Sequence, residues 1–265
     1  MVSRVIVLSP AVLLAAGILL AQADKSLLEK PKPPDQQGGL VPLPAEPSPT
    51  LTPERRADIH MARKEYREAV EVYKQASQDS PIIWNKIGIA YHQMQQLDTA
   101  KKHYERAIKM NPKYSEAINN LGTIWYAKRS YRRATNQYRK ALKLAPESAS
   151  IYSNLGTALF ARKKYEEAMD AYRQALTLDP EVFEHRSSYG VLLQERSVDE
   201  RSRFHYFLAK TYAAAGINDR ALLYIRRALE EGFKDRKLLT EEPEFAGLKD
   251  LPEFQELLKL EPKVL

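Results

Sequence analysis

A block of sequence returns three times at a fixed interval. Three glycines and three prolines each recur every 34 residues: Gly88, Gly122, Gly156, Pro112, Pro146 and Pro180. A period of this length is typical of chains built from stacked supersecondary units, because one unit cannot bury its apolar face alone. The sequence therefore predicts that the units pack against their neighbours along the chain.

Each unit contains two amphipathic halves when its proline is numbered position 32. Positions 4, 7 and 11 are apolar or aromatic, and positions 20, 24 and 27 are Ala, Tyr and Ala. Both spacings place the side chains on one face of a helix. Small residues at positions 8 and 20 allow the two helices to approach closely. With 44% apolar residues and only ten glycines in 265, an all-α protein is expected.

This pattern of Leu-Gly, aromatic and Ala positions closed by Pro resembles the tetratricopeptide repeat across residues 81–182. The resemblance implies a right-handed α-solenoid of helix-turn-helix units. It also implies a surface that recognises other proteins, since this is the usual role of the family.

Degenerate copies of the unit flank the three clear ones. Residues 53–80 are predicted to form an N-terminal capping repeat, and residues 202–235 a fourth unit that begins nineteen residues later than the period requires. The insertion at 183–201 is compatible with either a helix or an ordered loop. Residues 236–265 are predicted to form a helical cap.

The N-terminus is typical of an exported protein. Arg4 precedes an apolar run that ends in the A-x-A pattern of Ala21 and Ala23, which predicts a signal peptide over residues 1–23. A retained membrane anchor is the alternative. The proline-rich residues 24–52 are predicted to form a disordered linker. The absence of Cys excludes a lipid-modified cysteine and disulfides. We expect a periplasmic or secreted protein.

The first helix of each unit supplies the candidate binding groove. Positions 5, 6, 9 and 12 are expected to face its concave side, where amides can bond a peptide backbone and aromatic rings can anchor side chains. The alternatives are that the amides are merely solvated and that the rings pack under neighbouring repeats. The Asn rows resemble the asparagine ladder in the repeat domain of O-linked N-acetylglucosamine transferase, although Lys86 interrupts them. The candidate residues are Asn85, Lys86, Ile89, His92, Asn119, Asn120, Thr123, Tyr126, Ser153, Asn154, Thr157 and Phe160.

Other classes of function have weaker support. The five His show no metal-ligand spacing, and the chain lacks a Cys nucleophile and a Gly-rich phosphate loop, so no enzyme, metal or cofactor is expected. Basic pairs such as Arg132 and Arg133 indicate a solvated outer face, with binding of nucleic acid or an anionic membrane as the alternative. The expected partner is a protein or an extended peptide; a membrane is expected only if the signal is retained.

Overall fold

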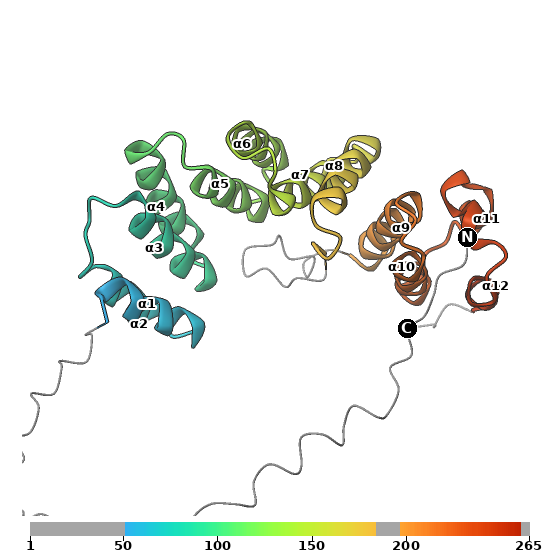
Figure 1. Cartoon of the computed structure of the whole chain (residues 1–265), viewed down its shortest axis with the longest axis horizontal. Helices are drawn as coiled ribbons and strands as arrows, with labels where there is room; N and C mark the ends of the chain where they lie inside the picture. The colour runs from blue at the N-terminus through green and yellow to red at the C-terminus, as the bar shows by residue number, and fades with distance from the viewer. Residues whose placement is uncertain (1–50, 184–196, 261–265) are drawn as a thin grey trace, which may run out of the picture. The chain divides into compact units, whose positions relative to one another are not determined.

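The computed structural model describes residues 51–183 and 197–260, and every regular element in these ranges is a helix (Figure 1). The predicted all-α solenoid is confirmed. The elements are α1 (Pro53–Ala62), α2 (Tyr66–Tyr73), α3 (Pro81–Gln93), α4 (Leu97–Met110), α5 (Ser115–Ala127), α6 (Tyr131–Leu144), α7 (Ala149–Ala161), α8 (Tyr165–Leu178), α9 (Val198–Ala214), α10 (Asn218–Glu230), α11 (Lys237–Glu241), the 3-10 helix η4 (Pro243–Leu248) and α12 (Pro252–Lys259).

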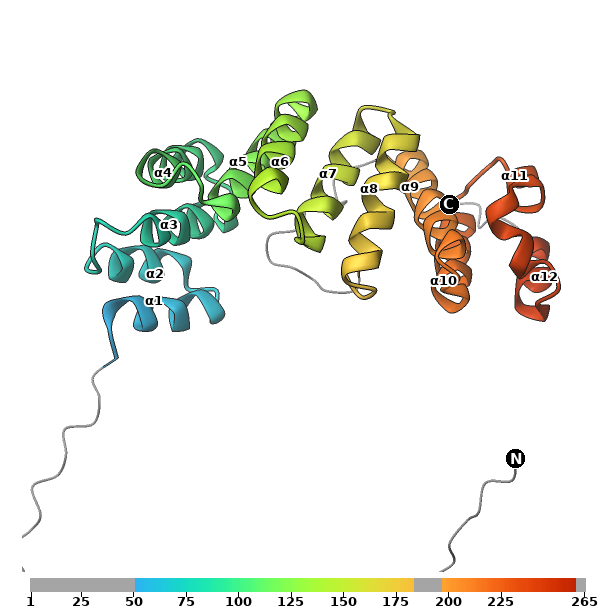
Figure 2. The same ribbon diagram turned by 45° about the horizontal axis from the view of Figure 1, so that its top comes forward.

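The helices associate as consecutive pairs. α3 packs on α4, α5 on α6 and α7 on α8, and the second helix of each pair contacts the first helix of the next. Figure 2 shows the same pairs from a second direction. The three repeats at residues 81–182 therefore each contribute one helix pair.

Close approach within each pair depends on glycine. A Cβ placed on Gly122 would lie 2.6 Å from Cε1 of Tyr138, and Gly88 and Gly156 face Tyr104 and Tyr172 in the same way. These tyrosines are fully buried, as are the alanines at positions 20 and 27, apart from 1% exposure of Ala168. The rings thus fill the space that a side chain at position 8 would occupy.

The turn inside each pair uses a left-handed residue. Gln95, Arg129 and Lys163 have φ values of 60°, 56° and 60°, and Gly216 has a φ of 73° at the equivalent place between α9 and α10. This conformation is unfavourable for residues with a Cβ. The pair α9 and α10 therefore has glycine, which adopts this conformation without strain, where the regular repeats have a strained residue.

The C-terminal region departs from the regular pattern. α9 begins at Val198, with the Ser197 hydroxyl accepting a hydrogen bond from the Glu200 amide at 3.2 Å, so this helix starts before Ser202. α9 packs on α10 and η4, and α12 contacts α10. Aromatic rings join α9 to α7 and α8: Phe204 and Phe207 both contact Phe160 on α7, and they also contact Tyr172 and Tyr165 on α8.

Several predicted segments lie outside the described residues. They are the signal peptide at 1–23, nearly all of the linker at 24–52, most of the insertion at 183–201 and the last five residues of the cap. Within the described part of the chain, no helix combines the length and the apolar character needed to cross a membrane.

Candidate functional site

The first helices α3, α5 and α7 share a face that carries positions 5, 6, 9 and 12, which we call the first-helix face. Four asparagines on it form a continuous chain of amide hydrogen bonds. Asn154 Nδ2 donates to Asn119 Oδ1 at 3.0 Å, and Asn120 Nδ2 donates to Asn85 Oδ1 at 3.0 Å. Asn119 Nδ2 donates to Asn120 Oδ1 at 3.4 Å and so connects the two pairs.

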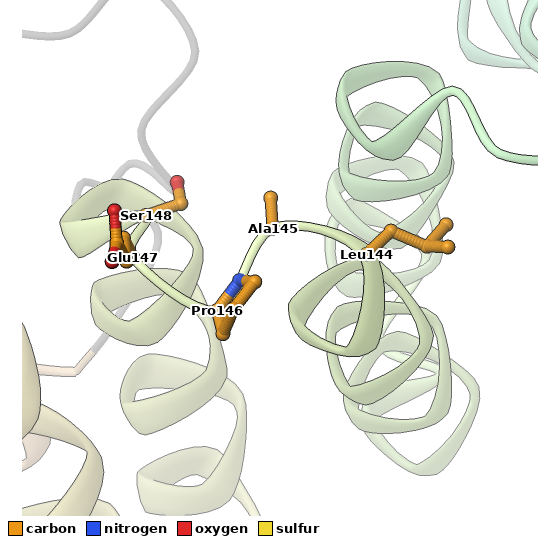
Figure 3. A pocket seen from close by; sticks show the side chains of 5 residues that line it. All are labelled: Leu144, Ala145, Pro146, Glu147 and Ser148. Carbon is orange, nitrogen blue, oxygen red and sulfur yellow. The ribbon is translucent and has the colours of Figure 1, made fainter.

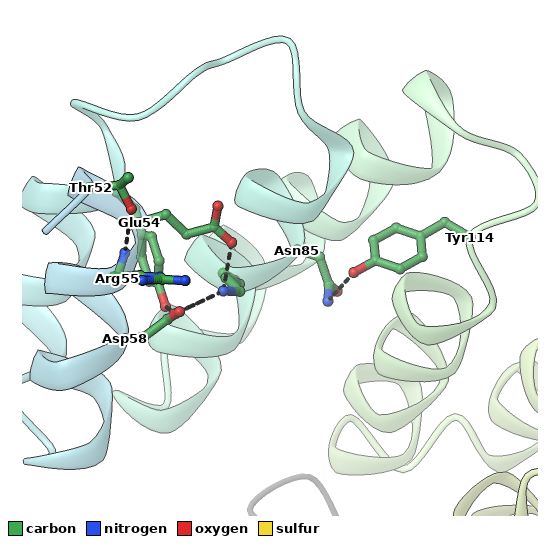
Figure 4. A network of polar contacts seen from close by, with 8 residues as sticks. Thr52, Glu54, Arg55, Asp58, Asn85 and Tyr114 are labelled. Carbon is green, nitrogen blue, oxygen red and sulfur yellow. Dashed lines mark hydrogen bonds and ion pairs between the residues drawn. The ribbon is translucent and has the colours of Figure 1, made fainter. Parts of the chain in front are cut away.

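The chain of amides ends on a tyrosine. Asn85 Nδ2 donates to the Tyr114 hydroxyl at 3.3 Å, and Figure 4 shows this ring turned toward Asn85 from the start of α5. All four asparagines are only 4–8% exposed. Since a buried amide without a partner is costly, these bonds stabilise the contact between neighbouring repeats.

The two inter-repeat bonds follow one rule. In both, position 6 of one repeat donates to position 5 of the repeat before it, and the residues are 35 apart in the sequence. Each bond uses only one of the two amide hydrogens of the donor and one of the two lone pairs of the acceptor. The inter-repeat bonds therefore leave part of each amide unused, on side chains that are only 4–8% exposed.

At the N-terminal end of the face, charged groups make the link to the preceding helix pair. Lys86 Nζ lies 2.8 Å from Glu54 Oε1 and 2.8 Å from Asp58 Oδ1, both on α1 (Figure 4). The Tyr73 hydroxyl also donates to Asp58 at 2.5 Å. Burial lowers the pKa of Lys86, but the two carboxylates outweigh it and raise the pKa overall. Lys86 is thus part of an inter-repeat ion cluster rather than a free cation.

The hydroxyl groups at position 9 bond to their own helices. Thr123 donates to the Asn120 carbonyl at 2.7 Å, and Thr157 donates to the Ser153 carbonyl at 2.9 Å. Ile89, at the same position, belongs to the core with Leu121 and Ile124. The side chains of Ile89, Thr123 and Thr157 are therefore buried beneath the first-helix face. Ser153 is half-buried on this face.

The position-12 rings differ in their surroundings. Phe160 is 4% exposed and packs edge-on against Tyr165, Phe204 and Phe207, so it fills the junction with α9. Tyr126 is half-buried against Tyr131, with ring centroids 5.2 Å apart. Burial lowers the pKa of His92, which favours its neutral form. Of the three rings, Phe160 is the one that packing removes from contact with a ligand.

Sequence reasoning missed the C-terminal counterpart of the asparagine bonds. Lys210 Nζ lies 2.7 Å from Glu242 Oε2 and 3.4 Å from Glu244 Oε1, and the Tyr206 hydroxyl donates to Glu242 at 3.0 Å. Tyr206 and Lys210 occupy positions 5 and 9 of the fourth unit. The 35-residue spacing of Asn85 and Asn120 could have predicted the amide bonds, but no period connects α9 with η4.

Concave sites suited to a small molecule are poorly developed. The pocket in Figure 3 is an open depression lined by one connecting segment between α6 and α7: Leu144, Ala145, Pro146, Glu147 and Ser148. Across residues 51–183 and 197–260, no three His, Asp or Glu side chains gather closely enough to hold a metal ion. The first-helix face is therefore the stronger candidate site.

Comparison with known families agrees with the repeat geometry. A model described as Tetratricopeptide repeat matches residues 81–114 and 149–182, and a second model, described as TPR repeat, matches residues 124–161. The chain contains tetratricopeptide repeats. These repeats form a protein-interaction scaffold, and the predicted protein partner agrees with this assignment. No curated protein matches the sequence.

Solved structures with a similar arrangement include several of MamA. MamA AMB-1 is 21% identical, with 68% of this chain and 98% of MamA covered and a TM-score of 0.47. MamA from Desulfovibrio magneticus RS-1, starting at residue 41, is 18% identical, with 68% and 92% of the chains covered and a TM-score of 0.47. At these values the likeness says nothing about function.

Proposed function

We propose that this protein is a non-enzymatic adaptor that binds an extended segment of another protein along the first-helix face. The observation that carries the proposal is the chain of amides from Asn154 to Asn85, which runs across three repeats. It supports a ligand that lies across the helices, because amide groups of fixed orientation can both donate to and accept from a peptide backbone.

The proposal includes the compartment predicted from the N-terminus. A protein with a signal peptide and no Cys would act in the periplasm or outside the cell, where its stability depends on packing. Assembly of the cell envelope or secretion is the process in which we place it. Support for this part comes from the sequence of residues 1–23 alone.

A substitution on the first-helix face that leaves the amides intact tests the proposal. Ser153→Arg adds a long charged side chain to a half-buried position on α7, and Asn136→Arg makes the same change in charge at an exposed position on α6. The parent and each variant are purified as the cells produce them, with or without residues 1–23. Each is then used for affinity capture from an envelope extract. We expect proteins retained by the parent and by Asn136→Arg to be lost from Ser153→Arg. Equal retention by all three would contradict binding on this face.

A further inference from the structure

The second helix of the middle repeat carries an unusual stripe of positive charge. Arg132, Arg133, Lys140 and Lys143 on α6 follow the spacing i, i+1, i+8 and i+11, which places them along one face of the helix, and Arg129 lies in the turn just before it. All five are exposed, and the four on α6 extend over roughly 16 Å. Residues 128–143 contain no Asp or Glu at all.

The five cations of this α6 stripe have no carboxylate partner among the described residues. The two other basic residues of the segment do: Lys128 lies 2.5 Å from Asp98, and Arg139 lies 2.8 Å from Glu167. The guanidinium of Arg133 lies 4.7 Å from the centre of the Trp125 ring. Mutual repulsion along the stripe is therefore left uncompensated within the part of the chain that the structure describes.

The first turns of the neighbouring helix α8 are acidic where those of α6 are basic or neutral. Where α6 has Arg132, Arg133 and Asn136, α8 has Glu166, Glu167 and Asp170. The bond between Arg139 and Glu167 shows that the two helices lie side by side at this level. The positive stripe of α6 thus lies next to an acidic cluster at the start of α8, and we call the two together the bipolar face.

The bipolar face constrains what can cover it. A broad polyanion seated on the α6 stripe would approach Glu166 and Asp170 one helix away, where like charges repel it. A complementary partner must present a negative and a positive stripe side by side. The chain itself contains such a surface, and a two-fold axis between α6 and α8 would face each stripe with its opposite.

We infer that the bipolar face is the contact between two copies of this chain, with α6 of each copy against α8 of the other. The symmetry makes every favourable contact occur twice, as in other isologous dimers. Exposed pairs of α8, such as Asp170 with Arg173 at 2.9 Å, are weak enough to exchange partners on association. The bipolar face is separate from the first-helix face, so either proposal can fail alone.

Charge reversal tests the dimer directly. The first variant reverses α6 (Arg132→Glu, Arg133→Glu, Lys140→Glu), the second reverses α8 (Glu166→Lys, Glu167→Lys, Asp170→Lys), and the third combines both sets and restores the net charge. Association is measured by analytical ultracentrifugation at low and high salt, and folding by circular dichroism. Lys140→Glu/Lys143→Glu is a milder α6 variant at positions without side-chain contacts, and Lys109→Glu/Lys113→Glu is a control of equal charge change on α4 and the turn after it.

The parent and the control are expected to dimerise at low ionic strength and to dissociate as salt rises. Either single reversal should weaken the dimer at least about tenfold. The combined variant should dimerise with itself and not with the parent. A parent that stays monomeric at low salt, or a dimer that tolerates both reversals, would overturn the inference. Binding of duplex DNA or anionic vesicles by a monomeric parent, lost on α6 reversal, would overturn it in favour of a polyanion.

Discussion

Neutral amides join the first helices in the regular repeats, whereas charged groups join them at both ends. Between α3, α5 and α7 the inter-repeat bonds run from Asn120 to Asn85 and from Asn154 to Asn119. At the N-terminal end Lys86 bonds to acids of α1, and at the C-terminal end Lys210 bonds to acids at the start of η4. A regular repeat has a similar repeat as its neighbour, so the same hydrogen bond between asparagines can recur from one repeat to the next. A terminal unit packs against a different kind of segment, and there an ion pair makes the contact.

The comparison predicts different responses to solution conditions. Amide pairs do not titrate and are little affected by salt, while ion pairs at partly exposed positions respond to both. Because units of a solenoid can open separately, the ends and the middle can be measured apart by hydrogen exchange.

Loss of Lys210 should have the largest effect. Lys210→Met leaves Glu242 and Glu244 partly buried without their cation, and we expect the C-terminal region to lose roughly 2 to 3 kcal/mol. Denaturant unfolding with hydrogen exchange of α9 to α12 measures this. The control is Lys259→Met, which breaks an exposed pair with Glu256 and should cost under about 0.5 kcal/mol. Equal effects of the two changes would mean that burial of the Lys210 cluster is unimportant.

Loss of a central amide should come next. Asn120→Leu removes the donor to Asn85 and the acceptor for Asn119, both buried, and should cost about 2 kcal/mol at any salt concentration. Denaturant titration at low and at high salt measures the free energy of unfolding. It checks both the size of the loss and its independence of salt. Asn136→Leu, at an exposed position, is the control. An unchanged stability of Asn120→Leu would contradict a structural role for the amide chain.

The turn between α9 and α10 should show a smaller effect. Gly216 has a positive φ and nothing within 4 Å of where a Cβ would be, so Gly216→Ala introduces backbone strain and no clash. We expect a loss of about 1 kcal/mol. The reciprocal change Lys163→Gly, in a regular repeat, relieves strain and should cost nothing in the same melting experiment. A loss on Lys163→Gly as large as that on Gly216→Ala would show that strain does not distinguish the turns.

The smallest expected effect is the pH dependence of the C-terminal link. The hydrogen bond from Lys210 is the main cause that holds the pKa of Glu242 below its usual value of 4.5. This carboxylate therefore stabilises the fold above pH 4.5, and that contribution is lost as the pH falls through its lowered pKa. Unfolding of the parent and of Glu242→Gln at a series of pH values measures it. The difference between them should shrink in acid, and a constant difference would contradict the assignment.

The repeat sequence predicted much of the fold because each helix pair repeats the same contacts. Gly122 and Tyr138 recur at a fixed interval, and their packing follows from that interval. The link between Lys210 and Glu242 could not be predicted, since it joins α9 to a segment outside the period. Residue type alone also could not show that Phe160 is covered, because Phe204 and Phe207 follow an insertion that shifts the period.

For the candidate site, the sequence predicted that the asparagines share one face. It did not show which groups their amides bond to. The alternative that the amides are merely solvated disagrees with the geometry, in which Asn120 and Asn154 are buried and bond to the preceding repeat. Sequence periodicity shows which side chains share a face. It does not show whether they meet each other or the solvent, since this depends on the distance between helices.

Binding on the first-helix face can be tested most directly by site-specific photocrosslinking. A photoreactive amino acid is placed at Ser153 on α7, or at the exposed Asn136 on α6, and the protein is irradiated in cells that express it. The account predicts a crosslink to a second polypeptide from position 153, and at most a crosslink to another copy of the chain from position 136. A partner crosslinked from position 136 and never from position 153 would contradict a binding role for the first-helix face.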